Sequence, residues 1–192
     1  MRKEPRQQRS RETVEAILQA TARILAERGW GGLTTNHVAG VAGVSVGSLY
    51  QYFPNKLSLI EAVRRRHFHE VLAALEAAGD RGKSRVQRVE GLVDGMIRAH
   101  GRDPAVHQVL MEEVPRGRES KTAHDAFEAE YLGRYESLIG NSRGPRSRRI
   151  AAQVLAAAIA GVVHDAARRG TLASPELKNE LVRLLSGYLN QS

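Results

Sequence analysis

The chain has 192 residues, and its 42% hydrophobic content is enough to form a core in one large domain or two small ones. It contains no cysteine, which excludes disulfides, thiolate metal sites and a cysteine nucleophile. The net charge is +8, and residues 1–70 hold 11 basic against 6 acidic side chains. This basic first third favours a polyanionic partner such as nucleic acid, although a solvated charged surface is the alternative.

The N-terminal segment, residues 1–12, is rich in arginine and has no apolar stretch. It therefore lacks the pattern of a signal peptide, and we predict a flexible basic arm. The most apolar run, residues 150–163, is shorter than the ~18 to 20 residues that a membrane helix needs. We accordingly expect a soluble, cytoplasmic protein.

The first helix is predicted from Thr13, where apolar residues begin to recur at helical spacing, and Gly29 ends it as a glycine stop. The Thr34–Thr35 pair offers a hydroxyl cap for a second helix of about two turns. Gly43 closes that helix. The sequence thus predicts a long helix followed by a very short one.

A third short helix is predicted over residues 46–53, and Pro54 ends it because proline has no backbone N–H. Asn55 can cap a fourth helix, which continues to a Gly-Asp-Arg-Gly loop at residues 79–82. Five more helices are predicted, in order, around 86–97, from 103 or 104 to before 115, around 127–135, up to 169 after a loop at 140–147, and from 175 onward. The sequence shows no strand alternation, so we predict an all-α chain of about nine helices.

The stretch from Gly43 to Lys56 has the features of a helix-turn-helix. A turn of about three or four residues between two short helices favours a glycine, which adopts positive φ without a steric penalty. If Leu49 points inward, a rotation of about 100° per residue sends Gly47, Tyr50 and Gln51 outward and keeps Val46, Tyr52 and Phe53 near the inner face. A glycine, a phenol and an amide on one exposed face suit the major groove of DNA. Half-buried tyrosines that cap a small core are the alternative.

The segment LTTNHVAGVAGVSVGSLYQYFPNKLSLIEAV, with the amphipathic helix before it, resembles the N-terminal DNA-binding domain of the TetR family of bacterial transcriptional regulators. The resemblance covers residues 12–63 and includes the Thr-Thr opening, the G-V-S-x-G-x-L-Y-x-Y-F run and the following lysine. The rest of the chain is similar in helix number and length alone. The resemblance implies a helix-turn-helix DNA-binding domain over 13–60 and a helical ligand-binding and dimerisation domain over 61–192.

The same resemblance implies roles for individual residues in binding double-stranded DNA. Thr35, Tyr52 and Lys56 are expected to contact phosphates. The residues expected in or beside the major groove are Ser45, Val46, Gly47, Ser48, Tyr50 and Gln51. Many relatives have a polar or basic residue where Val46 stands, so we expect an apolar contact there, for example with a thymine methyl group, or none. The basic arm is expected either to add salt-sensitive affinity for DNA or to be a solvated terminus.

A single small DNA-binding head contacts few base pairs, so we expect the protein to form a homodimer. The alanine-rich eighth helix and the leucine-striped ninth helix are the candidates for the interface, and the resemblance implies that they form a four-helix bundle with a second copy. Burial of both stripes within one chain is the alternative. The resemblance also implies a small-molecule pocket enclosed by helices five to eight. Its candidate residues are Met96, His100, His107, Met111, Phe127, Tyr131 and His164, although each alone also fits a plain core or surface position.

No metal, cofactor or enzyme activity is predicted, because the chain lacks metal-binding and catalytic sequence motifs. We therefore expect a ligand-responsive transcriptional regulator that represses genes from a pseudo-palindromic operator and is released by a hydrophobic or aromatic effector. Two alternatives stay open. One is a sequence-tolerant DNA-binding protein without an effector, and the other is a small-molecule-binding protein with a vestigial DNA-binding head.

Overall fold

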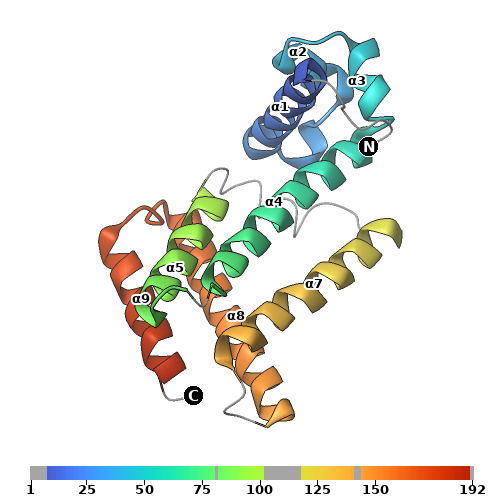
Figure 1. Ribbon diagram of the computed structural model, residues 1–192. Helices are drawn as coiled ribbons and strands as arrows, with labels where there is room; N and C mark the ends of the chain where they lie inside the picture. The colour runs from blue at the N-terminus through green and yellow to red at the C-terminus, as the bar shows by residue number, and fades with distance from the viewer. Residues whose placement is uncertain (1–7, 81, 102–117, 141–143, 191–192) are drawn as a thin grey trace. The chain divides into compact units, whose positions relative to one another are not determined.

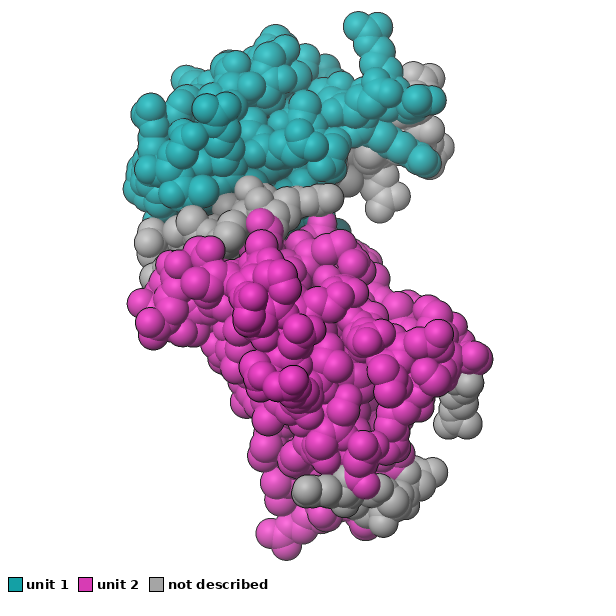
Figure 2. All heavy atoms as spheres, turned by 90° about the vertical axis from the view of Figure 1, so that its left-hand side faces the viewer, with its two compact units in different colours: residues 1–67, 103–116 teal, residues 68–102, 117–192 magenta. Residues whose placement is uncertain are grey.

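A computed structural model of the chain describes residues 8–80, 82–101, 118–140 and 144–190. In these ranges every regular element is an α-helix (Figure 1), which confirms the predicted all-α class. Eight helices lie in the described residues, and the helix predicted between 103 and 115 lies outside them. The chain divides into two compact units (Figure 2), the first containing residues 8–67 and the second the described residues from 68 onward.

The first unit contains α1 (Gln8–Gly32), α2 (Thr35–Ala42), α3 (Val46–Tyr52) and the beginning of α4 (Lys56–Ala78). Helix α1 packs against α2, and α2 packs against α3. Apolar side chains from all four helices and the loop before α2 form one core, which includes Ile17, Ile24, Leu25, Leu33, Val38, Leu49, Phe53, Leu59 and Ile60. Their removal from water is the main driving force for folding this unit.

Helix α1 begins earlier than its apolar pattern predicts. The prediction placed its start at Thr13, after a flexible arm, but the chain is helical from Gln8. Thr13 Oγ1 donates a hydrogen bond to the Arg9 carbonyl at 2.9 Å, and Gln8 Nε2 donates to Glu12 Oε1 at 3.3 Å. These contacts between residues four apart support a helical turn that contains no apolar residue. The predicted arm is therefore wrong for residues 8–12, and residues 1–7 lie outside the described ones.

Gly29 interrupts α1 where the sequence predicts its end. Its φ of 63° and ψ of −171° are not helical, and glycine adopts them because it has no Cβ. A short further turn then runs to Gly32. Trp30 lies in this further turn, directly after the break.

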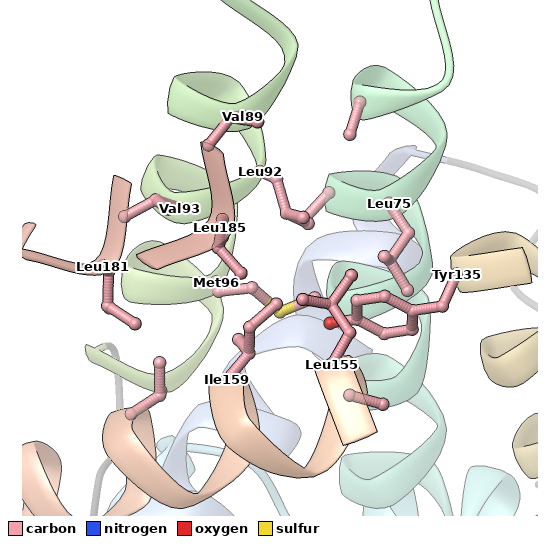
Figure 3. Close-up of a cluster of buried hydrophobic side chains, with 14 of the residues drawn as sticks. Leu75, Val89, Leu92, Val93, Met96, Tyr135, Leu155, Ile159, Leu181 and Leu185 are labelled. Atoms are coloured by element: carbon pink, nitrogen blue, oxygen red, sulfur yellow. The ribbon is translucent and has the colours of Figure 1, made fainter. Parts of the chain in front are cut away.

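The second unit contains the rest of α4, α5 (Arg85–Gly101), α7 (Arg118–Ile139), α8 (Pro145–Arg169) and α9 (Pro175–Asn190). Helix α7 packs on α8, and α5 packs on both α8 and α9. Figure 3 shows the side chains that converge in its core, among them Leu75, Leu92, Met96, Tyr135, Leu155, Ile159 and Leu185. The first unit reaches residue 67, whereas the sequence predicts the domain boundary after residue 60. Both positions lie inside α4.

Two features hold α5 in place within this unit. A Cβ added to Gly95 on α5 would lie 2.4 Å from the Ala74 Cβ on α4, so the two helices approach each other closely at this point. Polar contacts connect α9 to α5 near both ends of α9. Arg85 Nη1 donates to the Leu189 carbonyl at 2.7 Å, and Lys178 Nζ pairs with Asp94 Oδ1 at 2.7 Å.

Helix α8 is the one helix in the described residues that is long and apolar enough to cross a membrane, judged by length and composition. A single such helix is a weak indication, because a core helix of a soluble protein meets the same criteria. Leu155, Ile159 and Val163 of α8 are buried in the core of the second unit. These contacts account for the apolar character of α8.

Candidate functional site

The corner between α2 and α3 is built around a glycine in the left-handed region. Gly43 has φ 67° and ψ 29°, which only glycine adopts at little cost. The N–H groups of Gly43 and Val44 donate to the carbonyls of Gly40 and Ala39 at 3.2 and 3.0 Å and close the end of α2. Gly43 therefore has the conformation that the sequence predicts for it.

Hydroxyl side chains cap the start of both short helices. Thr34 Oγ1 accepts a hydrogen bond from the His37 backbone N–H at 3.2 Å at the start of α2. Ser45 Oγ accepts one from the Ser48 backbone N–H at 3.0 Å at the start of α3. These caps satisfy N–H groups that have no partner within the helix, and they fix where each helix begins.

The inner face of α3 agrees with the helical count in two of three positions. Tyr52 and Phe53 are buried around Leu49, as predicted. Val46 is 39% exposed, so its placement near the inner face is wrong. It is the first residue of the short helix, nearly a full turn from Leu49, and it reaches the open end where less of the unit covers it.

The outer face of α3 is small, polar and open. Ser45, Gly47 and Gln51 are exposed, and Tyr50 is 42% exposed. A Cβ at Gly47 would meet only Ser45 Oγ, at 3.8 Å, so the backbone here is accessible from outside. Ser48 is half-buried, and its hydroxyl shares a 2.8 Å hydrogen bond with Ser45. Gly47, Tyr50 and Gln51 therefore share the exposed face that the helical count predicts, whereas Ser48 is partly covered.

A hydrogen bond connects the predicted phosphate contact on α2 with the predicted groove contact on α3. Thr35 Oγ1 and the Tyr50 hydroxyl lie 3.1 Å apart, and either can be the donor. Fifteen residues separate the two in sequence, so no local sequence pattern predicts their contact. The pair stands at the outer surface of the first unit.

Lys56, the third predicted phosphate contact, lies against Trp30. Its ammonium group donates to the Trp30 carbonyl at 2.8 Å and lies 3.7 Å from the centroid of the Trp30 ring. An ammonium group has three N–H donors, so this hydrogen bond leaves two for other acceptors. Tyr52, by contrast, is a buried side chain of the core.

In the second unit, two of the candidate effector residues form a histidine pair. The ring centroids of His100 on α5 and His164 on α8 are 5.0 Å apart. His100 Nδ1 is 2.9 Å from the Met96 carbonyl, and because a carbonyl only accepts, Nδ1 carries the proton. Burial lowers the pKa of His100 to about 4, and burial also lowers the pKa of His164. His100 is therefore neutral near pH 7.

The aromatic candidates of α7 belong to a continuous series of rings. Phe127 stacks on Phe68 of α4, with centroids 3.9 Å apart, and on Tyr131, at 5.4 Å. Tyr131 meets the edge of Tyr135 at 5.0 Å. Burial raises the pKa of both tyrosines. Figure 3 shows Tyr135 pointing into the core. The role of Phe68 could not be predicted from the sequence, because a single aromatic residue on an apolar helical stripe carries no special signal.

The remaining candidates do not add to this site. His107 and Met111 lie outside the described residues. Met96 is buried in the core and contributes its carbonyl to His100. The described part of the chain contains no group of three or more His, Cys, Asp or Glu side chains that could hold a metal ion.

One face of α8 carries an exposed stripe of apolar and small residues. Ile150 and Val154 are 52% and 51% exposed, and Ala157 and Gly161 continue the same face as exposed positions. On α9, Leu184 is also exposed. Helical residues spaced by three or four lie on one side of the helix, so these four positions of α8 form a continuous strip. Other residues of α8 and α9, including Ile159 and Leu185, are buried in the core of the same chain.

Two short helices that meet at a left-handed glycine, with a buried inner face and an open polar outer face on the second, define a helix-turn-helix domain. The family described as "Bacterial regulatory proteins, tetR family" matches residues 17–63. The family described as "Tetracyclin repressor-like, C-terminal domain" matches residues 86–189, which is more than half of the chain. The chain belongs to the TetR family.

Individual relatives agree with this membership. The chain is 32% identical over 124 residues to the HTH-type transcriptional repressor KstR of Mycolicibacterium smegmatis, covering 65% of this chain and 59% of KstR. It is 28% identical over 186 residues to the HTH-type transcriptional repressor BepR of Brucella suis, covering 94% of this chain and 80% of BepR. A solved transcriptional regulator from Rhodococcus sp. Rha1 has the same fold, with a TM-score of 0.75, 21% identity, and coverage of 93% of this chain and 96% of that one. The chain spans between 46% and 59% of the length of three KstR proteins that it matches.

Proposed function

We propose that the protein is a transcriptional repressor that binds a pseudo-palindromic operator as a homodimer and leaves it when a small molecule binds the second unit. The open outer face of α3 is the observation that carries this proposal. A helix with an accessible backbone at Gly47 and with hydroxyl and amide side chains around it can enter the major groove. Repression is the activity in the names of KstR and BepR, and their similarity supports it here.

The DNA contacts divide by the position of each residue. Tyr50, Gln51 and Ser45 face outward from α3 and suit base edges, and exposed Val46 suits a thymine methyl group. Thr35 stands at the first position of α2, where the helix dipole favours a phosphate. Lys56 keeps donors for a phosphate beyond the one it gives to Trp30.

The composition of the second unit supports an uncharged, hydrophobic or aromatic effector. The rings of Phe127 and Tyr131 lie in the aromatic series, and the buried His100 is neutral. A buried neutral site disfavours an ion, because the ion would lose its hydration without gaining an opposite charge. The effector acts by binding more tightly to the conformer with low DNA affinity, and the ratio of its two affinities limits how far it shifts the equilibrium.

The exposed strip on α8 supports the dimer. Ile150, Val154, Ala157 and Gly161 combine apolar area with small side chains, which allows close packing against a second copy. On α9, the second helix of the proposed bundle, Leu184 is an exposed apolar residue as well. A cytoplasmic location, where the DNA is, and the lack of an enzymatic role follow from the same proposal.

Fluorescence anisotropy with the purified full-length protein tests the DNA-binding function. The two probes are duplexes from the DNA that flanks its own gene and a scrambled control, each measured at two salt concentrations. Tight binding to the flanking DNA alone supports the proposal. Equal, strongly salt-dependent binding to both duplexes contradicts it and favours a sequence-tolerant DNA-binding protein.

Once a specific duplex is known, the same assay tests the effector. Hydrophobic and aromatic compounds are screened for release of the labelled duplex, and direct binding of each compound is measured by calorimetry. A compound that binds the protein and lowers its DNA affinity supports ligand control. Compounds that bind without changing the DNA affinity contradict it, because coupling requires different affinities for the two conformers.

A further inference from the structure

The hydrogen bond between Thr35 and Tyr50 has a consequence for how Tyr50 meets DNA. Its partners come from the start of α2 and the outer face of α3, and their oxygens are 3.1 Å apart. Both helices are held by their own caps, at Thr34 and Ser45, so the two hydroxyls are positioned before DNA arrives. The bond therefore belongs to the free protein.

Two hydroxyl groups have two protons between them, and their mutual hydrogen bond uses one. One O–H therefore remains to donate outward, from Thr35 or from Tyr50. When Thr35 donates outward, Tyr50 donates to Thr35, and the phenol oxygen can then only accept from a third group. The contact made by Thr35 thus determines whether Tyr50 is a donor or an acceptor toward the groove.

Phosphate oxygens only accept hydrogen bonds, so a DNA phosphate that is bound by Thr35 directs the threonine O–H outward. In the major groove the available donors are the amino groups of adenine and cytosine, whereas guanine and thymine present acceptors at the equivalent positions. We infer that Tyr50 accepts a hydrogen bond from an adenine or cytosine amino group, and that Thr35 is the positioning residue that gives Tyr50 this polarity. The inference rests on the proposed function and adds to it the kind of base that Tyr50 selects.

The test begins with duplexes that the full-length wild-type protein enriches from a random-sequence library. In the enriched site, each adenine is replaced in turn by unsubstituted purine and each cytosine by pyrimidin-2-one, which lack the amino group. At one position we expect this loss to weaken wild-type binding about three- to tenfold, the range for one hydrogen bond. Tyr50→Phe should show no such loss at that position, because it has no oxygen to accept the bond.

Two variants of Thr35 separate a positioning role from a structural one. Thr35→Val removes the hydroxyl with little change in shape and should abolish the discrimination against the analogue, in addition to weakening all DNA binding through the lost phosphate contact. Thr35→Ser keeps a hydroxyl and should restore the discrimination. Tyr135→Phe, which removes the hydroxyl of a tyrosine buried in the core of the second unit, is the matched control and should leave the discrimination unchanged. Thermal unfolding of each variant confirms that it is folded.

Four results would count against the inference. The inference is wrong if removing an amino group lowers the DNA affinity of wild type and Tyr50→Phe equally at every position. It is also wrong if Thr35→Val keeps the full discrimination. In both cases specific binding by the wild-type protein would still support the proposed function. A dependence of Tyr50 on a guanine or thymine acceptor, found by single base-pair substitution, would reverse the polarity and overturn it as well. If the wild-type protein enriches no sequence, the proposed function fails, and the inference fails with it.

Discussion

Lys56 is held by the protein itself, against the carbonyl and the ring of Trp30. The family resemblance assigns this lysine to a phosphate, and the sequence alone could not reveal the second role, because Trp30 lies 26 residues earlier. The contact depends on the break at Gly29, which ends the regular part of α1 just before the tryptophan. Lys56 thereby connects the end of α1 to the start of α4.

Replacing Lys56 with methionine keeps the aliphatic stem and removes the charge. We expect the free energy of unfolding to fall by about 1–2 kcal/mol, because a charge-assisted hydrogen bond and a cation–π contact are lost at a half-buried site. Urea denaturation without DNA measures this loss. Lys83→Met is the control, since the Lys83 ammonium is exposed and 3.8 Å from Asp80. If the Lys56→Met protein is as stable as wild type, the contact with Trp30 does not contribute to the free energy of unfolding.

His100 predicts a loss of stability in acid. Its pKa in the folded protein is about 4, below the ordinary 6.5, because burial disfavours the charged ring. The unfolded chain therefore binds more protons than the folded one between these values, and the stabilising contribution, complete above pH 6.5, is lost as the pH falls towards 4. The loss amounts to about 3 kcal/mol over this window.

His100→Gln provides the comparison for that prediction. Glutamine does not titrate, so its unfolding free energy should depend less steeply on pH between 6.5 and 4 than that of wild type. Urea denaturation at several pH values measures both slopes, and the carboxylates contribute equally to each. Parallel slopes would show that His100 is protonated in the folded protein at the same pH as in the unfolded chain.

At the scale of helices, the close approach of α4 and α5 leaves no room for a side chain at Gly95. Gly95→Ala would put a Cβ 2.4 Å from the Ala74 Cβ and 3.1 Å from its Cα, so the backbones must move apart. We expect a net destabilisation of about 1–3 kcal/mol, despite the better helix propensity of alanine. Thermal denaturation gives the difference from wild type.

Gly91 is the matched control on the same helix. A Cβ at Gly91 meets no atom within 4 Å, so Gly91→Ala should stabilise the protein by up to about 1 kcal/mol. Opposite signs for the two substitutions are the diagnostic result. If both glycines behave alike, helix propensity rather than the contact with Ala74 governs the region.

Most helices could be predicted from the sequence, because their apolar periods and end signals agree. Gly43 marks the corner between α2 and α3 in both sequence and structure. The start of α1 could not be predicted, since its first turn depends on polar contacts such as that of Thr13 with Arg9. The exposure of Val46 could not be predicted either, because counting 100° per residue gives the side of the helix but not how much of the unit covers its first residue.

For the candidate site, sequence reasoning found residues but not their partners. It placed Tyr50 on the outer face and chose both His100 and His164, which the structure brings together. It could not find the bond of Thr35 to Tyr50 or the stack of Phe68 on Phe127, because both depend on how separate helices pack. Residue type predicts chemistry, whereas pairing requires the tertiary fold.

At the scale of the whole molecule, the exposed strip on α8 predicts the oligomeric state. Val154→Glu places a charge in the centre of the proposed interface, where it would be desolvated without a partner. We expect wild type to be a dimer and Val154→Glu a folded monomer in size-exclusion chromatography with light scattering. The monomer should also bind operator DNA more weakly, since it contacts one half-site.

Val86→Glu serves as the control for this experiment. Val86 lies on α5 and is 56% exposed, so the substitution adds the same charge to an exposed apolar position outside the strip. It should remain dimeric. A dimer that tolerates Val154→Glu as well would place the interface elsewhere on the chain.

The two polar contacts between α9 and α5 imply that α9, the last described helix, does not fray. Terminal helices usually open locally with little free energy, but Arg85 holds the Leu189 carbonyl at one end of α9 and Asp94 holds Lys178 near the other. In hydrogen–deuterium exchange, the amides of α9 should therefore exchange as slowly as those of α5, and Arg85→Met should speed exchange in the last turn of α9. Exchange in α9 that is fast throughout would contradict this. Slow exchange would mean that α9 opens together with α5, as one cooperative unit.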